Sequence, residues 1–144
     1  QADQAAVITR NHPEGIKGAQ ATALAVFLAR TGHDKDTIRQ RIMQDFGYDL
    51  TRTIDDIRPE YTFDISCRGT VPEAMIAFLD ADSWENTIRN AVSLGGDSDT
   101  LACIAGGIAE AFYGQIAPDI RRQVALILPP DLWKVTAAFC ARYL

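Results

Sequence analysis

The chain has 144 residues, of which 47% are hydrophobic and 23% charged, and its net charge is −5. A chain of this length and composition forms one globular domain with a core. The acidic balance argues against a nucleic-acid partner, and no apolar run approaches the roughly 20 residues of a membrane span. We therefore expect a single domain over residues 1–144 that binds neither nucleic acid nor membranes.

Three cysteines, Cys67, Cys103 and Cys140, lie far apart and form no Cys-x-x-Cys pair. This number and spacing favour free thiols over a disulfide framework or a zinc site. We expect buried small side chains in a reducing compartment, the cytoplasm. The N-terminal residues show no signal-peptide pattern. Because the chain does not begin with Met, we expect it to be part of a longer protein.

Two helices are predicted near the N-terminus. His12-Pro13-Glu14 opens the first, because proline is tolerated in the first turn of a helix. The residues from Gly18 to Arg30 are apolar almost all the way round, which predicts a helix buried on every side. Asp34 is the predicted N-cap of the second helix, and Gly47 is its predicted end.

Short elements occupy the middle of the chain. Residues 50–57 keep helical spacing over a short segment that Pro59 ends. Residues 59–69 alternate between polar and apolar like a strand, but no partner strand is predicted, so we expect an extended loop. Thr70-Val71-Pro72-Glu73 has the form of a capping box and predicts the start of the next helix.

Helical patterns continue to the C-terminus. Ser83 is a predicted N-cap, and an Ala- and Gly-rich helix follows Gly95-Gly96. Pro118 opens a further helix that ends at Pro129-Pro130, and a last helix follows it. We therefore expect an all-α fold, a compact bundle of about seven or eight helices without a sheet.

Asp97, Asp99 and Thr100 place three oxygen-bearing side chains within four positions at the start of the Ala- and Gly-rich helix. Carboxylates completed by a hydroxyl are ligands that hard divalent cations such as Mg²⁺ prefer. In the alternative interpretation, Asp97 or Ser98 is an N-cap and Asp99 is a first-turn acid that the helix dipole favours. The local pattern leaves both interpretations open.

Three stretches resemble the ADP-ribosylglycohydrolase family, the all-helical, metal-dependent hydrolases that remove ADP-ribose from modified proteins or small molecules. They run from Asn11 to Ala19, from Tyr61 to Ala74, and from Gly95 to Thr100 with the helix that follows. They occur in the family's order over nearly the whole chain, and the last is the most specific. The resemblance implies an all-α fold and Mg²⁺-dependent cleavage of ADP-ribosyl glycosidic bonds.

The resemblance also implies roles for individual residues. Asp97 and Asp99 are implied to act in catalysis and, with Thr100, to hold a pair of Mg²⁺ ions, with Mn²⁺ as the other candidate metal. Such a pair polarises the ribose hydroxyls and positions a water for attack at the anomeric carbon. The residues implied to bind the substrate are His12, Gly95, Gly96, Ser98, Tyr61, Phe63 and Ser66.

Structural alternatives stay open for some of these residues. The alternative for His12 is a ring that hydrogen-bonds to a helix end, and the alternative for Tyr61 and Phe63 is packing in the core. Glu14 is most simply a favourable charge in the first turn of a helix.

The sequence departs from the family pattern in two respects. Family members are longer, and their N-terminal half supplies a Gly-Asp motif, a catalytic acid and a Thr-Asp-Asp metal motif that do not occur here. Asp55-Asp56 follows Ile54 in a short linking helix and does not replace that motif. Arg10 stands where a second histidine is expected. Half of the metal ligands are thus missing, so we expect the isolated chain to be an incomplete catalyst.

Two functions of different classes follow. The first is an ADP-ribosylglycohydrolase that acts on an ADP-ribosylated protein or a small ADP-ribose conjugate, the linkage being unspecified. The second is a non-catalytic domain, truncated or crystallin-like, that is structural or binds ADP-ribose weakly, with Asp97 and Asp99 as helix caps only. Helix faces that pack on a missing half leave apolar surface exposed, so we expect a homodimer, with domain swapping as one route to it.

Overall fold

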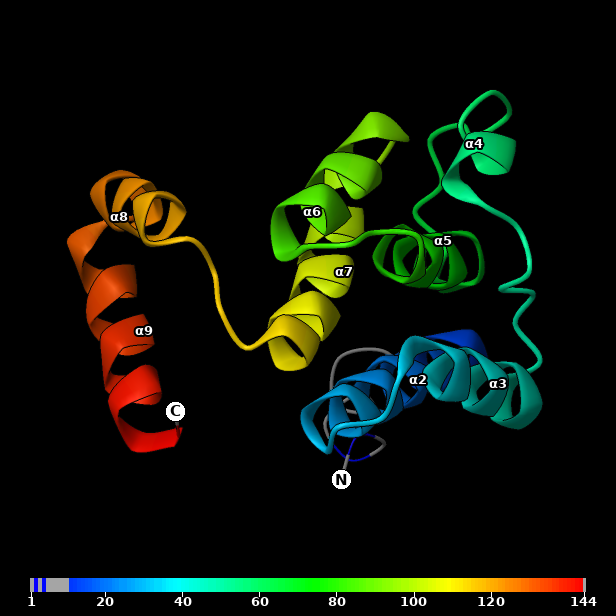
Figure 1. Cartoon of the computed structure of the whole chain (residues 1–144), viewed down its shortest axis with the longest axis horizontal. Helices are drawn as coiled ribbons and strands as arrows, with labels where there is room; N and C mark the ends of the chain where they lie inside the picture. The colour runs from blue at the N-terminus through cyan, green and yellow to red at the C-terminus, as the bar shows by residue number, and fades with distance from the viewer. Residues whose placement is uncertain (1, 3, 5–10, 144) are drawn as a thin grey trace. The chain divides into compact units, whose positions relative to one another are not determined.

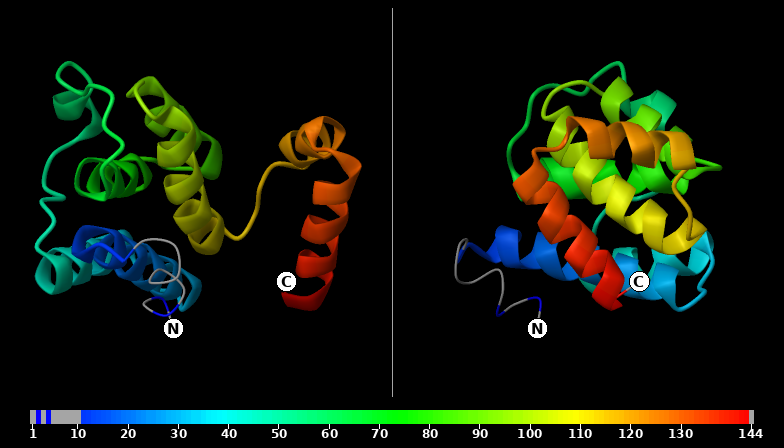
Figure 2. Two further views of the ribbon diagram at one scale, coloured as in Figure 1. Left: turned by 180° about the vertical axis from the view of Figure 1, so that it is seen from behind. Right: turned by 90° about the vertical axis from the view of Figure 1, so that its left-hand side faces the viewer.

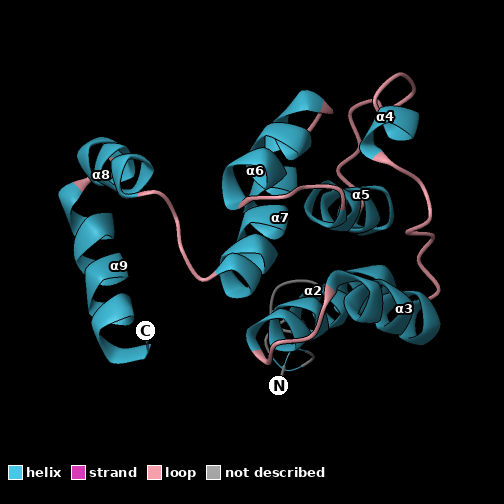
Figure 3. Cartoon of the chain, viewed as in Figure 1, coloured by secondary structure: helices cyan, strands magenta, loops and turns pink. Residues whose placement is uncertain are grey.

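The computed structural model describes residues 2, 4 and 11–143, so Arg10 lies outside the described residues. The described residues form helices joined by loops and turns, with no strand among them (Figure 3). The all-α prediction is therefore confirmed. The chain divides into two compact units, Gln1–Gly114 and Gln115–Leu144, and a single domain over residues 1–144 stays a prediction. No helix in the described part is long and apolar enough to cross a membrane.

The first unit is built around two helices, α5 and α7. Helix α7 packs against α2, α5 and α6, and α2 packs also against α3 and α5 (Figures 1 and 2). The short helix α4 lies next to α5. The helices of this unit are α2 (Pro13–Arg30), α3 (Lys35–Phe46), α4 (Ile54–Ile57), α5 (Cys67–Leu79), α6 (Trp84–Ser93) and α7 (Ser98–Tyr113).

The core of this unit lies along α5 and α7. Every residue of α5 from Thr70 to Leu79 is buried. Helix α7 buries small residues such as Ala105 and Gly106, which let its neighbours come close. A Cβ added at Gly106 would lie 2.8 Å from Ile88 Cδ1, and the indole of Trp84 donates to the Gly106 carbonyl at 3.2 Å. Small residues on α7 therefore fix its distance from α6.

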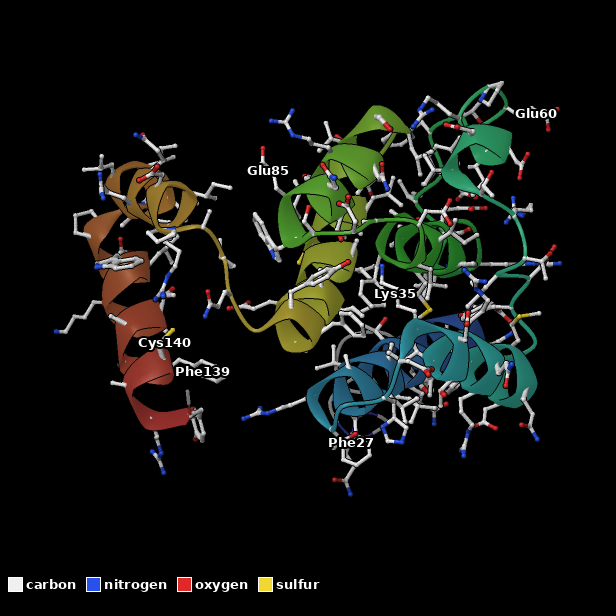
Figure 4. All side chains as sticks on the ribbon, in the orientation of Figure 1. Phe27, Lys35, Glu60, Glu85, Phe139 and Cys140 are labelled. Carbon is white, nitrogen blue, oxygen red and sulfur yellow. The ribbon has the colours of Figure 1, made fainter. Side chains whose placement is uncertain are left out.

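Two predictions about burial are wrong. Helix α2 is not buried on all sides, because the unit covers only one face of it and Phe27 on the outer face is 60% exposed (Figure 4). The three cysteines are free, as expected, but none is buried: Cys103 is exposed, and Cys67 and Cys140 are half-buried. Cys103 faces outward because α7 turns its buried residues toward the other side.

The helix starts at Asp34 and Ser83 are confirmed, whereas the predicted start of α5 at Thr70 is wrong. Helix α5 begins one turn earlier, because Ser66 is its N-cap and accepts a hydrogen bond from the Gly69 N–H at 3.1 Å. The Thr70 hydroxyl donates instead to the carbonyl of Asp64 at 2.9 Å. Pro72 thus lies inside the helix. Two overlapping cap patterns compete here, and local sequence alone does not rank them.

The second unit consists of α8 (Pro118–Ile127) and α9 (Pro130–Tyr143). Neither helix contains a buried residue among those the structure describes. About 30 residues are too few to form a core of their own. The large apolar side chains of this unit that are exposed are Val124, Leu126, Ile127, Leu132, Trp133, Val135, Phe139 and Tyr143.

Lys35, at the start of α3, holds the C-terminal end of α5 (Figure 4). Its Nζ donates to the carbonyls of Phe78 (2.9 Å), Leu79 (3.2 Å) and Ala81. The same atom lies 4.9 Å from the centre of the Phe78 ring and 5.5 Å from that of Tyr113 on α7. Burial lowers the pKa of Lys35. One cation thus satisfies orphaned carbonyls of α5 and contacts α7.

We expect Lys35→Met to lower the free energy of unfolding by about 1–3 kcal/mol, because the apolar stem is kept while hydrogen bonds to a charged donor are lost. Lys134→Met is the control, since Lys134 is an exposed residue of α9. Urea unfolding followed by circular dichroism measures both. Equal midpoints for the two variants would contradict the role given to Lys35.

Candidate functional site

A turn of two glycines connects α6 to α7. Gly95 and Gly96 have φ values of +74° and +60°, in the left-handed region that disfavours residues with a side chain. The Gly95 N–H donates to the Val92 carbonyl at 3.1 Å, which closes the last turn of α6. The chain then enters α7 with Asp97 at the N-cap position. The conformation of the two glycines therefore sets the direction in which the chain enters α7.

The loop from Tyr61 to Phe63 lies directly against this turn. A Cβ added at Gly96 would meet Tyr61 Cε1 at 3.0 Å, Phe63 Cα at 3.2 Å and the Thr62 carbonyl oxygen at 3.3 Å. Only a glycine therefore allows this approach. The contact brings together two of the stretches that the sequence singled out, which lie more than 30 positions apart.

Asp97, Asp99 and Thr100 lie in the first turn of α7 and its cap. The Thr100 N–H donates to Asp99 Oδ1 at 2.9 Å. The neighbouring Asp97 carboxyl group, together with this N–H, holds the pKa of Asp99 below its usual range. Asp97 occupies the N-cap position, but its side chain makes no capping hydrogen bond. Its carboxylate is therefore not used to stabilise the helix end in the way that N-caps usually are.

The donor set in this turn fits part of a magnesium site. Asp97 and Asp99 offer two carboxyl groups at the start of one helix, and the exposed Thr100 adds a hydroxyl oxygen. A Mg²⁺ ion requires six ligands, and within the described residues no three or more His, Cys, Asp or Glu side chains gather in a group that could hold a metal ion. These residues would therefore supply only a portion of the coordination shell.

A cavity of about 300 Å³ lies beside the Tyr61 loop, lined among others by Arg52, Asp56, Glu60, Tyr61, Asp64 and Glu73. Glu73 is only 8% exposed; its Oε1 accepts from Arg52 at 2.8 Å, and its buried Oε2 has no partner among the described residues. Burial raises the pKa of Tyr61, whose hydroxyl also lacks a partner there. These groups can bind a polar ligand.

The sequence analysis missed Arg52 and gave Glu73 only a role in a capping box. The signal for Glu73 was present, because it is the one charged residue in the apolar run from Thr70 to Leu79. A charged side chain within an apolar run is usually buried beside a partner of opposite charge, or it binds a ligand. Arg52 lies 21 positions earlier and carries no comparable signal.

Other predicted site residues act as helix caps in the structure. His12 is the N-cap of α2, and its Nδ1 accepts from the Glu14 N–H at 3.3 Å, which is the structural alternative considered for it. Ser66 is the N-cap of α5. Phe63 is 69% exposed and so does not pack in the core, whereas Tyr61 is half-buried against it. Among the described residues, no hydrogen bond or ion pair joins His12 to the Gly96 turn.

Comparison with known proteins gives a consistent result. A family model described as ADP-ribosylglycohydrolase matches residues 1–142. ADP-ribosylhydrolase ARH3 of Mus musculus is 33% identical over 82 residues, which cover 56% of this chain and 21% of that protein. The Homo sapiens protein of the same name is 44% identical over 50 residues, covering 35% of this chain and 13% of that protein.

These matches cover a larger share of this chain than of the relatives. The matched segments span about a fifth or less of the curated relatives' length. No solved structure matches the chain. The similarity therefore concerns one part of those longer proteins.

We expect Gly96→Ala to be more destabilising than Gly95→Ala. Both variants place a side chain at positive φ, which costs about 1–2 kcal/mol. A Cβ at Gly95 meets nothing within 4 Å, whereas one at Gly96 meets the Tyr61 loop. The additional cost at Gly96 is about 1–3 kcal/mol from overpacking. Thermal unfolding of the two variants measures the difference, and equal melting temperatures would contradict the close approach.

Proposed function

The chain belongs to the ADP-ribosylglycohydrolase family, and on that premise we propose that it is part of a hydrolase that cleaves ADP-ribosyl glycosidic bonds. The observation that carries the proposal is the first turn of α7. There Asp97 and Asp99 place two carboxyl groups near each other, and Asp97 is not used as a capping side chain. The relatives named ADP-ribosylhydrolase ARH3 support the same reaction class.

In this proposal Asp97, Asp99 and Thr100 hold Mg²⁺, or Mn²⁺ in its place. When bound, the metal would polarise the ribose hydroxyls and would position a water for attack at the anomeric carbon. The lowered pKa of Asp99 favours the charged form that would hold the metal. Further ligands come from outside the described residues, which supply only two carboxylates at this place.

The substrate is an ADP-ribosylated protein or a small ADP-ribose conjugate. Gly95, Gly96 and Ser98 border the metal ligands along the chain, so a substrate held by the metal would approach their backbone. Tyr61 and Phe63 lie against Gly96 and would line the same side. His12 and Ser66 act here as helix caps, and we propose contact with the substrate for them only as a second role. Three free cysteines support a reducing compartment, the cytoplasm.

A non-catalytic role, structural or weakly ADP-ribose-binding as in a crystallin-like relative, is the second candidate. It is favoured by the incomplete donor set among the described residues. In that case Asp97 and Asp99 only stabilise the N-terminus of α7, through the interaction of their negative charges with the helix dipole.

In a protein in which the remaining metal ligands accompany this chain, we expect Asp97→Asn and Asp99→Asn each to abolish Mg²⁺-dependent release of ADP-ribose while leaving helicity unchanged, because the metal loses a charged ligand. Asp119→Asn is the matched control, since Asp119 is an exposed acid in the first turn of α8. Chromatography of released ADP-ribose measures the reaction. Activity retained in both site variants would overturn the enzyme proposal and favour the non-catalytic one.

We further propose that the chain forms a homodimer, because α8 and α9 leave apolar side chains uncovered. Light scattering at several concentrations is expected to give twice the chain's mass, and Phe139→Glu is expected to reduce it, since Phe139 is exposed on α9. Asp131→Glu, a conservative change on the same helix, is the control. A single-chain mass at every concentration would contradict dimerisation.

A further inference from the structure

A second cavity, of about 560 Å³, shares the lining residue Arg52 with the first. Lys17 and Glu14 of α2, Tyr48 and Asp49 of the loop between α3 and α4, and Arg68 of α5 line it together with Arg52. In Figure 1 this loop runs down the side of the unit between α4 and α3. None of these residues belongs to the proposed metal site, so the cavity requires its own explanation.

Two cations at this cavity have no carboxylate partner among the described residues. Neither Lys17 nor Arg68 makes a hydrogen bond or ion pair there, although Lys17 Nζ lies 4.6 Å from the centre of the Tyr48 ring. Arg68 lies in the first turn of α5, which contains no acid. A cation at a helix N-terminus is disfavoured by the helix dipole. The position of Arg68 therefore does not stabilise α5, and a bound anion would accept hydrogen bonds from its guanidinium group.

Tyr48 provides an independent observation. Its side chain is 5% exposed, and its hydroxyl is buried without a hydrogen-bond partner among the described residues. Burial, with the nearby Glu14 carboxylate, raises the pKa of Tyr48 to about 12, so the hydroxyl keeps its proton at neutral pH. An unsatisfied buried hydroxyl costs about 1–3 kcal/mol. A ligand oxygen in the cavity would remove that cost.

The acids at the cavity restrict the ligand further. Asp49 is already engaged by the Thr51 N–H at 3.0 Å and the Thr51 hydroxyl at 2.6 Å. Arg52 is engaged by Glu73 at 2.8 Å. Glu14 differs, because its Oε2 is buried and has no partner among the described residues. A carboxylate oxygen accepts a hydrogen bond, so the ligand must offer a hydroxyl as well as an anionic group.

We propose that this cavity binds a phosphate ester that carries hydroxyl groups, such as a sugar phosphate. The phosphate oxygens accept hydrogen bonds from Lys17, Arg68 and the Tyr48 hydroxyl, and a hydroxyl of the ligand donates to Glu14. Lysine and arginine are the common partners of phosphate, and the neutral tyrosine adds a directional donor. The site goes beyond the proposed hydrolase function and does not depend on Asp97 or Asp99.

The test is calorimetric titration of ribose 5-phosphate into the chain without added metal. We expect saturable binding at one site, weakened at least tenfold by Arg68→Gln and by Tyr48→Phe. Tyr48→Phe keeps the ring under Lys17 and removes only the unpartnered hydroxyl, so its ligand-free stability should be equal or higher. This combination separates ligand binding from a structural role.

Arg89→Gln and Asp99→Asn are the controls. Arg89 is an exposed cation that pairs with Glu85 on α6, and Asp99 belongs to the proposed metal site. Both variants should bind ribose 5-phosphate as tightly as the unmodified chain, and ribose without phosphate should not bind. Absence of saturable binding, equal affinity in Arg68→Gln, or loss of binding in Asp99→Asn would each overturn the proposal. Equal affinity for inorganic phosphate would overturn the role of Glu14.

Discussion

The candidate site depends on the contact between the backbone of Gly96 and the loop from Tyr61 to Phe63. Gly95 and Gly96 both have positive φ, and a Cβ added at Gly96 would collide with the loop. The close packing of α7 against its neighbours, set by residues such as Gly106, fixes the direction in which the turn leaves α6. The acids of α7 therefore lie beside the loop because small residues on two elements permit it.

Charge is arranged around the first unit in two different ways. The ammonium group of Lys35 has partners within the fold, since it donates to carbonyls at the end of α5 and lies against aromatic rings. Lys17 and Arg68 line a cavity, and their side chains make no hydrogen bond or ion pair within the described residues. Structural cations satisfy orphaned groups of the fold, whereas unpaired ones leave their donors available to a ligand. Arg52 borders both cavities and is held by Glu73.

Local features of the fold could be predicted from the sequence, and features that depend on distant contacts could not. The caps at Asp34 and Ser83 and the end at Gly47 are set by a few neighbouring residues. The cap at Ser66 was missed because the Thr70 pattern overlaps with it.

The metal-ligating pattern in α7 was recognisable because its residues are adjacent in sequence. Tyr48, Arg52 and Arg68 were not singled out, since they gather only when α2, α5 and the loop before α4 are folded together. Burial was also misjudged at Phe27, because periodicity shows how apolar a helix is but not which of its faces the rest of the chain covers.

The central claim is that the first turn of α7 binds a divalent cation, and calorimetric titration of Mg²⁺ into this chain tests it most directly. The account predicts saturable binding that is lost in Asp99→Asn and kept in Asp119→Asn, the matched first-turn acid of α8. Absence of binding by the unmodified chain, or equal binding by Asp99→Asn, would contradict the claim and leave Asp97 and Asp99 as residues of a helix terminus only.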